Sequence, residues 1–395
     1  MNQTDELNLY PRLGVPIIVD RVETFLIRLT SDGEPTRREP TLRTIFGRGT
    51  LYSDLVETLL VRIQSRDGAV GWGEALAPVG ARAVAGAIND GVASLVIGQD
   101  AGRIRANLAR MQESMRERGH LGGLYADAIA AIDIALWDLV GQTHGLSVSA
   151  MLGGAFRERI PTYVSSIAGE DDDERAGTIS ALAEEGAHSF KLHLGHGVAA
   201  DLASFERLSS AAPGCRFAVD VHGVYTLPEA HSLAAGLADR GAWFLESALP
   251  PDAMDDFARL SSRSSLPIAA GEAFRNRFEV ASWLSRDALS IYQPDTGRTG
   301  ITEAANIAVM TSASGRQLMP HHSIALAPAL AAGMHVAATA QLMPAFEYQI
   351  AAVRNANSLI TAPLDVSPAE ANVPNGPGLG IELREDAIRD IAISG

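Results

Sequence analysis

Cysteine and long hydrophobic runs are scarce in this sequence. Its 395 residues include one cysteine, Cys215, which excludes an internal disulfide framework and any metal site built from several cysteines. A reducing, cytoplasmic setting fits that composition. The N-terminal residues are polar and acidic, so we expect no signal peptide. Residues 324–346 carry no full charge, but proline, glycine, histidine and glutamine interrupt them, so we predict a buried helix and no membrane partner.

Positive charge is also in short supply. Lysine and arginine total 32 against 47 aspartates and glutamates, which gives a formal net charge of −15. We therefore expect no nucleic-acid partner. An anionic substrate would have to be drawn by a local cation or metal ion rather than by the overall field of the protein. The length of the chain predicts two domains rather than one core.

The first part of the chain, to about residue 150, has the pattern of an α+β unit. Apolar residues alternate in 22–29 and in 57–65, and a glycine-bearing turn follows the second run, which predicts strands and a hairpin. Residues 38–53 carry glycine and arginine without a clear period, and we interpret them as a mobile loop. Residues 125–145 have a helical pattern that ends at Gly145.

From about residue 161 the pattern changes to short β-rich runs that alternate with helical stretches. The eight candidate strands are PTYVSS, SFKLHLG, RFAVDVHG, WFLES, PIAAGE, LSIYQPD, RQLMPHH and PAFEYQ. Eight strands separated by helices over roughly 200 residues are typical of a (β/α)₈ TIM barrel, so we predict the α/β fold class. The tail after residue 365 is rich in turns and then strand-like, and we expect it to return to the N-terminal unit.

Ionisable residues stand at or near the C-terminal end of seven of these strands. They are Lys191, Asp220, Glu246, Glu272, Asp295, His321 and Glu347. Successive members are 23 to 29 residues apart, about one strand and one helix each. Because the active site of a (β/α)₈ barrel lies at the C-terminal ends of its strands, this near-even spacing predicts a shared site.

Three of these residues are carboxylates on adjacent strands: Asp220, Glu246 and Glu272. Crowded carboxylates raise each other's pKa unless a cation lies between them. Oxygen ligands without cysteine suit a hard ion, Mg²⁺ first and Mn²⁺ second. The alternative is that they are solvated strand-end acids or helix caps, a reading that is more plausible for one residue than for all three.

Bases flank the predicted metal site. Lys191 and His193 come from the second strand and His321 from the seventh, while Asp295 is placed to hydrogen-bond a histidine ring and set its tautomer. Glu347, on the eighth strand, would face them across the barrel. A divalent ion with bases on opposite sides of a pocket suits removal of a proton next to a carboxylate, because the ion neutralises the developing enediolate charge.

Several short motifs occur in a specific order and spacing. They are AIDIALWDLVGQTHGLSVSAMLGG, KLH, VDVHG, FLES, AAGE, QPDTGRTGITEA, MPHH, FEY and VPNGPGLG. With them nearly the whole chain resembles the mandelate racemase/muconate lactonizing enzyme family of the enolase superfamily. The resemblance implies an α+β capping domain (1–150), a modified barrel with the active site (151–364) and a C-terminal segment that returns to the capping domain (365–395).

The resemblance also implies roles for individual residues. Mg²⁺ would bind the three carboxylates, and Lys191 would bind the substrate carboxylate. Asp295 and His321 resemble the Asp–His dyad of the mandelate racemase subgroup. The lysine that the muconate lactonizing and dipeptide epimerase subgroups carry near the sixth strand is not found in this sequence.

The sequence departs from the usual family pattern at two histidines. His193 stands where most members have the second lysine of Lys-x-Lys, which favours a general-acid or hydrogen-bonding role because histidine titrates near pH 6.5. His222 follows Asp220 by two residues and resembles the histidine that protonates the departing hydroxyl in some acid-sugar dehydratases; a residue that only orients Asp220 is the alternative. We assign the dyad to His321 and leave His322 as a candidate substrate contact.

Together these features predict a Mg²⁺-dependent lyase, an acid-sugar dehydratase that converts an aldonate or aldarate into a 2-keto-3-deoxy acid. The same enediolate would also serve a racemase or epimerase of a hydroxy acid, or a cycloisomerase of a sugar-acid lactone. A remote alternative is a non-catalytic metal- or sugar-acid-binding protein. Arg43, Arg48 and Tyr52 lie in the predicted loop over the pocket and are candidate ligands of a small polyhydroxylated carboxylate. The resemblance also implies a homo-oligomer.

Overall fold

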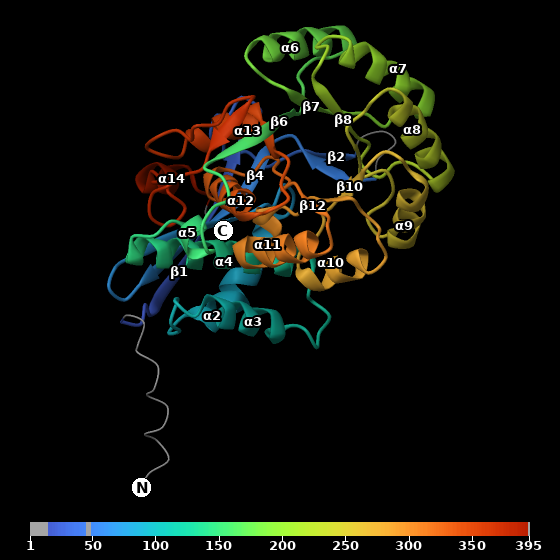
Figure 1. Cartoon of the computed structure of the whole chain (residues 1–395). Coiled ribbons are helices and arrows are strands. Elements are labelled where there is room, and N and C mark those ends of the chain that lie inside the picture. The colour runs from blue at the N-terminus through green and yellow to red at the C-terminus, as the bar shows by residue number, and fades with distance from the viewer. Residues whose placement is uncertain (1–14, 45–48, 394–395) are drawn as a thin grey trace.

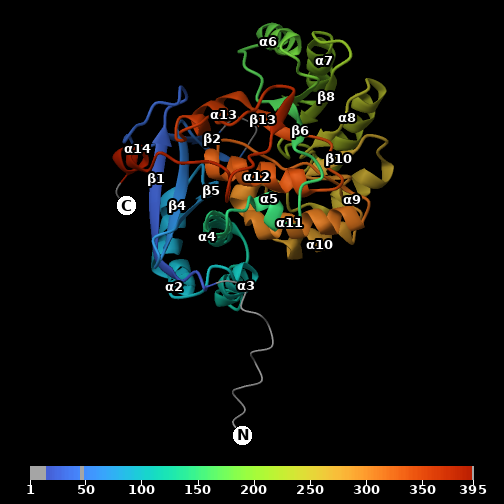
Figure 2. The same cartoon turned by 60° about the vertical axis from the view of Figure 1, so that its left-hand side comes forward.

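The computed structural model describes residues 15–44 and 49–393 (Figure 1). The chain forms a curled sheet of parallel strands with an antiparallel sheet beside it, and helices cover the outside of the curled sheet (Figures 1 and 2). This arrangement confirms the predicted α/β class, a modified TIM barrel with an N-terminal capping region.

The antiparallel sheet comes from the N-terminal part of the chain, and its strand order is β1-β4-β5. Its strands are β1 (Val19–Leu29), β4 (Val56–Ser65) and β5 (Val70–Ala75), and the helices after them are α1 (Ala81–Ala87), the π-helix η1 (Ile88–Val92), α2 (Ala93–Val96), α3 (Ile104–Ser114), α4 (Gly123–His144) and α5 (Val148–Met151). The predicted strands and the predicted helix that ends at Gly145 are therefore confirmed; Gly145 has φ 68°, the left-handed conformation of a helix C-cap.

The sheet packs closely on α4. A Cβ atom on Gly73 of β5 would lie 2.0 Å from the carbonyl oxygen of Ala131 in α4, so only glycine permits this approach. The buried face of α4 is rich in alanine, isoleucine and leucine, which explains why a 22-residue helix runs through the interior of the protein.

The segment predicted as a mobile loop contains a small hairpin, so that prediction was wrong for part of it. Strands β2 (Leu42–Thr44) and β3 (Leu51–Ser53) pair antiparallel, with Arg43 opposite Tyr52. Leucine, threonine and tyrosine favour strands, but each strand is three residues long and too short for the alternation to show. Arg48 lies outside the described residues.

All eight strands predicted for the barrel are present. They are β6 (Arg159–Ser165), β7 (Ser189–His193), β8 (Arg216–Asp220), β9 (Leu245–Glu246), β10 (Ile268–Ala270), β11 (Ile291–Tyr292), β12 (Gln317–Leu318) and β13 (Phe346–Gln349). They pair in parallel in the order β12-β11-β10-β9-β8-β7-β6-β13. Parallel neighbours bring all their C-terminal ends to one side, which is what the predicted site requires.

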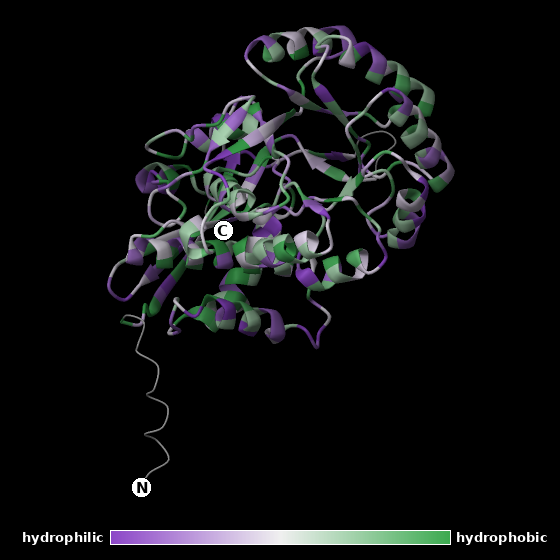
Figure 3. Cartoon of the chain, viewed as in Figure 1, coloured by the Kyte–Doolittle hydropathy of each residue, from purple (hydrophilic) through white to green (hydrophobic). Residues whose placement is uncertain are grey.

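Helices alternate with these strands along the chain. They are α6 (Asp172–Glu184), α7 (Val198–Ser209), α8 (Leu227–Asp239), α9 (Met254–Arg263), α10 (Arg277–Leu284), α11 (Thr296–Ala313), α12 (Ala327–Thr339) and α13 (Ile350–Asn357). Hydrophilic and hydrophobic residues alternate along many of them, as expected for helices with one face on a core (Figure 3).

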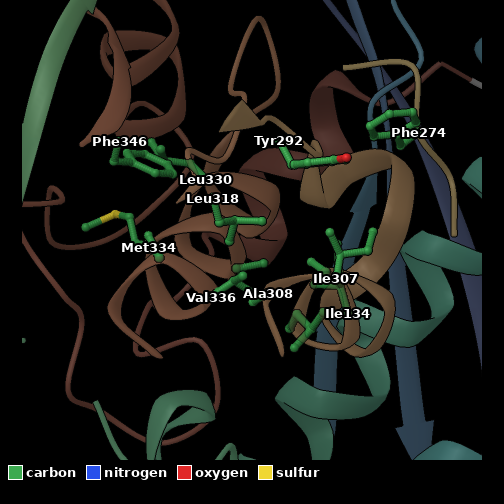
Figure 4. Packing of buried hydrophobic residues seen from close by; sticks show 14 of the residues in the cluster. Ile134, Phe274, Tyr292, Ile307, Ala308, Leu318, Leu330, Met334, Val336 and Phe346 are labelled. Carbon is green, nitrogen blue, oxygen red and sulfur yellow. The ribbon is translucent and has the colours of Figure 1, made fainter. Parts of the chain in front are cut away.

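The charge-free stretch forms α12, which is buried over nearly its whole length, as predicted. Leu330, Met334 and Val336 of α12 belong to the same hydrophobic cluster as Ile307 of α11 and Phe346 of β13 (Figure 4). Among the described helices none is long and apolar enough to cross a membrane.

The C-terminal segment reaches both parts of the fold. Strand β14 (Glu370–Asn372) pairs antiparallel with β6 at the barrel, and α14 (Glu385–Ile391) lies beside β1 (Figure 2). Ile393 forms an antiparallel bridge with Leu26 of β1. The end of the chain thereby ties the barrel to the N-terminal sheet.

Candidate active site

Neighbouring strands place the predicted site residues side by side. In the parallel ladder His193 of β7 is the partner of Asp220 of β8, and Asp220 is the partner of Glu246 of β9. Lys191 and His193 share one face of β7 because they are two residues apart. Lys191 is buried and His193 is half-buried at the mouth of the barrel.

Lys191 lies between two buried carboxylates. Its Nζ is 3.0 Å from both Glu246 oxygens and 2.8 Å from Glu347 Oε1, and all three side chains are at most 2% exposed. Burial alone would lower the pKa of Lys191, but Glu246 and Glu347 outweigh it and raise the pKa well above 10.5. Lys191 is also the only lysine of the chain. It is therefore a fixed, permanent positive charge under the site.

The two carboxylates differ in basicity although they share this lysine. Burial raises the pKa of Glu246, and Asp220 and Glu347 add to the shift against the attraction of Lys191. For Glu347, burial is outweighed by Lys191 and His321, so its pKa lies well below the usual range. The side chain of Gln293, which follows β11, donates to Glu246 Oε2 at 2.7 Å. The sequence did not reveal this contact because β10 separates β11 from β9 in the sheet, so the side chain reaches past a neighbouring strand.

His321 and Asp295 form the predicted hydrogen-bonded pair. His321 Nδ1 is 2.7 Å from Asp295 Oδ2, while Asp295 Oδ1 accepts the backbone N–H of Gly297 at 2.8 Å. A carboxylate can only accept here, so Nδ1 carries the proton and Nε2 faces the cavity side, 3.3 Å from Glu272 Oε2. Burial would lower the pKa of His321, but Glu347, Asp295 and Glu272 raise it to about 9.

Two histidines surround Asp220. His193 Nε2 lies 3.8 Å from Asp220 Oδ2, and His222 Nδ1 lies 3.3 Å from Oδ1, with the two rings edge-to-face at 5.0 Å. Burial lowers the pKa of His193 to about 4, although Asp220 pulls it upward, so the ring is neutral at neutral pH and suits hydrogen bonding more than proton donation. His222 has φ 52°, a strained backbone conformation for a non-glycine residue that is common at functional sites.

Two sets of metal-ligating atoms meet at Asp220. One is the predicted carboxylate set with Glu246 and Glu272; Asp220 and Glu246 are direct neighbours in the sheet. The other is Asp220 with His193 and His222, whose ligand atoms all lie within 4.8 Å of one another. Burial, Asp220 and Glu347 raise the pKa of Glu246 although Lys191 contacts both of its oxygens, and a hard divalent cation bound to these oxygen ligands would lower it.

A cavity of about 640 Å³ opens above these groups. Its lining includes the predicted residues Arg43, Tyr52, Lys191, His193, Asp220, His222, Glu272, His321 and Glu347. The hairpin β2–β3 supplies Arg43 and Tyr52, so the N-terminal part of the chain forms the roof. Among the described residues His322 is not part of the lining; it is buried, and its ring lies 6.3 Å from that of Phe346.

One lining residue was missed by the sequence reasoning. Arg298 stands in QPDTGRTG, three residues after Asp295, and faces the same cavity. Its position in the first turn of α11, next to a strand-end aspartate, was a signal that could have found it.

Comparisons with known proteins agree with this geometry. Residues 45–153 match the mandelate racemase/muconate lactonizing enzyme N-terminal domain, and residues 174–387 match the enolase C-terminal domain-like family. The D-galactarolactone cycloisomerase of Agrobacterium fabrum is 31% identical over 372 residues, 89% of this chain and 96% of that protein. The D-galactonate dehydratase of Ralstonia pickettii is 33% identical over 301 residues, 73% of this chain and 77% of that protein.

The fold comparison gives the same result. The crystal structure of a putative isomerase from Sinorhizobium meliloti, in an open loop conformation, superposes with a TM-score of 0.89 at 33% identity and covers 95% of this chain and 99% of that one. Both curated relatives are enzymes, one an isomerase and one a lyase. The chain belongs to the mandelate racemase/muconate lactonizing enzyme family of the enolase superfamily.

Proposed function

We propose that this protein is an acid-sugar dehydratase, which removes the proton at C2 of a sugar acid and expels the C3 hydroxyl as water. The observation that carries the proposal is the hydrogen bond of 2.7 Å between His321 and Asp295, which holds one proton on Nδ1 and makes Nε2, at the wall of the cavity, the atom that gives up or takes the second proton. The sugar-acid relatives support the substrate class.

Side chains on different walls of the cavity have different chemical roles. In its neutral form His321 takes the C2 proton at Nε2, and Asp295 holds the ring in the required tautomer and stabilises the imidazolium that forms. Lys191 places a positive charge beside the substrate carboxylate. His222 or His193 assists the departure of the C3 hydroxyl from the other wall of the cavity; the low pKa of His193 favours His222 as the proton donor.

The fold family implies a divalent metal ion. Asp220, Glu246 and Glu272 would hold it, Mg²⁺ first and Mn²⁺ second, and the ion would neutralise the charge that develops on the substrate carboxylate during proton removal. Oxygen donors on neighbouring strands and the raised pKa of Glu246 fit such an ion.

A cycloisomerase is the second candidate. It is favoured by the similarity to the D-galactarolactone cycloisomerase, which extends over 96% of that protein. Both reactions begin with loss of the C2 proton and differ in what leaves C3, water in one case and the ring oxygen of a lactone in the other. Proton removal is therefore common to both proposals, and the leaving group separates them.

Proton NMR on a panel of aldonic, aldaric and lactone acids, in D₂O with enzyme and Mg²⁺, would test the proposal. A dehydratase should consume the C2 signal and produce 3-deoxy methylene resonances, which a cycloisomerase would also give from a lactone but not from an open-chain acid. Deuterium at C2 with the hydroxyl retained would indicate an epimerase. A complete lack of exchange or turnover on the panel would contradict the proposal and support the non-catalytic alternative.

A further inference from the structure

Arg298 is a cation in the wall of the catalytic cavity, and the charges of Asp127 and Asp295 act on it only from beyond ion-pair distance. Its Nε atom is buried and has no hydrogen-bond partner in the described part of the chain. Within residues 15–44 and 49–393 no carboxylate forms an ion pair with its guanidinium, whereas nearby Arg275 contacts Asp127 at 2.6 Å. A buried donor left without a partner is unfavourable, so a ligand group that satisfied Arg298 would bind roughly 10- to 100-fold more tightly than one that did not.

The local fold does not explain the charge. Arg298 stands in the first turn of α11, where the positive end of the helix dipole disfavours a cation. Its backbone N–H already closes the turn on the Asp295 carbonyl at 3.1 Å, and any residue would make that bond. Burial would raise the pKa of Asp295, and His321 lowers that pKa more than Arg298 does. The long-range attraction between Arg298 and Asp295 provides no hydrogen bond for the Nε–H group of Arg298.

A second cation faces the same cavity from the roof. Arg43 of β2 lines the cavity and likewise forms no ion pair with a carboxylate of the described residues. Two arginines of the lining, Arg43 and Arg298, therefore have no carboxylate within ion-pair distance among the described residues. Lys191, the third cation of the lining, lies at the floor on β7 and is already placed for the reacting carboxylate.

We propose that Arg298, assisted by Arg43, binds a second carboxylate of the substrate, so that the enzyme prefers sugar diacids, that is aldarates or their monolactones, over aldonates. The guanidinium fork matches a carboxylate with two parallel hydrogen bonds, which a hydroxymethyl group cannot replace. The cavity of about 640 Å³, lined by both Lys191 and Arg298, has room for a six-carbon diacid. This inference rests on the proposed function and specifies its substrate class.

The test compares two substrates that differ at a single carbon. Galactarate and D-galactonate carry a carboxylate and a hydroxymethyl group at C6 and are otherwise alike; if neither reacts, the aldarate and aldonate of the configuration that does react replace them. The wild-type enzyme should have the higher kcat/KM for the diacid. Arg298→Gln should lower that value roughly 10- to 100-fold, mainly through KM, and should lower the aldonate value much less.

Controls separate a binding role from a structural one. Arg286→Gln removes an exposed arginine that pairs with Asp255 away from the cavity. It should not change kcat/KM for either substrate. Arg298→Lys keeps the charge without the fork, so it should lose part of the diacid preference even if Arg298→Gln fails to fold. Equal losses on both substrates, or a wild-type enzyme without diacid preference, would overturn the inference.

A binding measurement keeps the inference separate from the reaction. Glutarate and butyrate have two carboxylates and one, and neither has a hydroxyl to eliminate. By calorimetry the wild-type protein should bind glutarate more tightly than butyrate, and Arg298→Gln should abolish the difference. If no acid on the panel reacts while this difference is present, the proposed reaction is wrong and the second carboxylate site stands; if the difference is missing, the site is wrong whatever the reaction.

Discussion

Removal of the only lysine should destabilise the protein strongly and in a pH-dependent manner. Lys191→Met would leave Glu246 and Glu347 facing each other with no cation between them, and both are at most 2% exposed. Breaking a buried ion pair in this way typically costs about 3–5 kcal/mol. Glu347 can limit the cost, because Lys191 and His321 keep its pKa low in the wild-type protein and without Lys191 it can take up a proton instead of remaining charged.

The free energy of taking up this proton gives the magnitude of the stability loss. Protonating a glutamate whose unfolded pKa is about 4.3 costs roughly 4 kcal/mol at pH 7.5 and roughly 2 kcal/mol at pH 5.5, at about 1.4 kcal/mol for each unit. In the variant the folded pKa of that glutamate lies above the unfolded value, so the loss of stability grows as the pH rises. We therefore expect Lys191→Met to lower the free energy of unfolding by about 4 kcal/mol at pH 7.5 and by about half as much at pH 5.5.

Urea unfolding at pH 7.5 and 5.5 measures the loss in free energy of unfolding at each pH. EDTA is present so that no metal ion replaces the lysine. The double variant Lys191→Met/Glu246→Gln is the matched control: it removes one of the two charges and should recover most of the loss. In the wild-type protein, ¹⁵N-labelled lysine gives one side-chain resonance, which should remain that of a charged ammonium above pH 10.5. A loss below about 1 kcal/mol, or one that does not change with pH, would refute the account of this cluster.

Two further predictions concern the dyad and the join between the sheet and the barrel. Asp295→Asn removes the carboxylate that fixes the proton on His321 Nδ1, so C2 exchange should fall at least about 100-fold while substrate affinity stays within a few fold; unchanged exchange by NMR would contradict the dyad. Burial raises the pKa of Glu74 to about 7, against hydrogen bonds from Leu326, Ala329 and Thr58. Because this folded pKa exceeds the unfolded value of 4.5, stability should fall by roughly 3 kcal/mol between pH 4.5 and 7, and Glu74→Gln should flatten that part of the profile; parallel curves in urea unfolding would show that Glu74 is not the cause.

The fold was predictable from the sequence to a large extent because strand periodicity and strand-end residues are local signals. All eight barrel strands carry them, including β9 and β11, which are two residues long. The hairpin β2–β3 was missed because its strands bury little and show no alternation. Alternation in a sequence indicates a strand only when one face of that strand is buried. The residues of this hairpin cover a cavity and are mostly exposed, so no alternation appears.

The site was predictable in its membership but not in its pairings. The end of each strand indicated which residues meet, and the cavity brings most of them together. Which carboxylate Lys191 contacts, and that Gln293 also reaches Glu246, depend on packing across the barrel between strands far apart in the sequence. Arg298 escaped notice for a related reason: whether a charged residue has a partner is a property of its surroundings in space.

Proton exchange at C2 of a sugar acid tests the central claim most directly. It would be measured by proton NMR in D₂O with Mg²⁺, for the wild-type protein and for His321→Asn on a substrate taken from the panel. We expect exchange with the wild-type protein and a loss of at least about 100-fold in the variant. The Mg²⁺ affinity of the variant should be unchanged because His321 is not among the proposed ligands. Exchange at the wild-type rate in His321→Asn would contradict the claim and move the base to another residue.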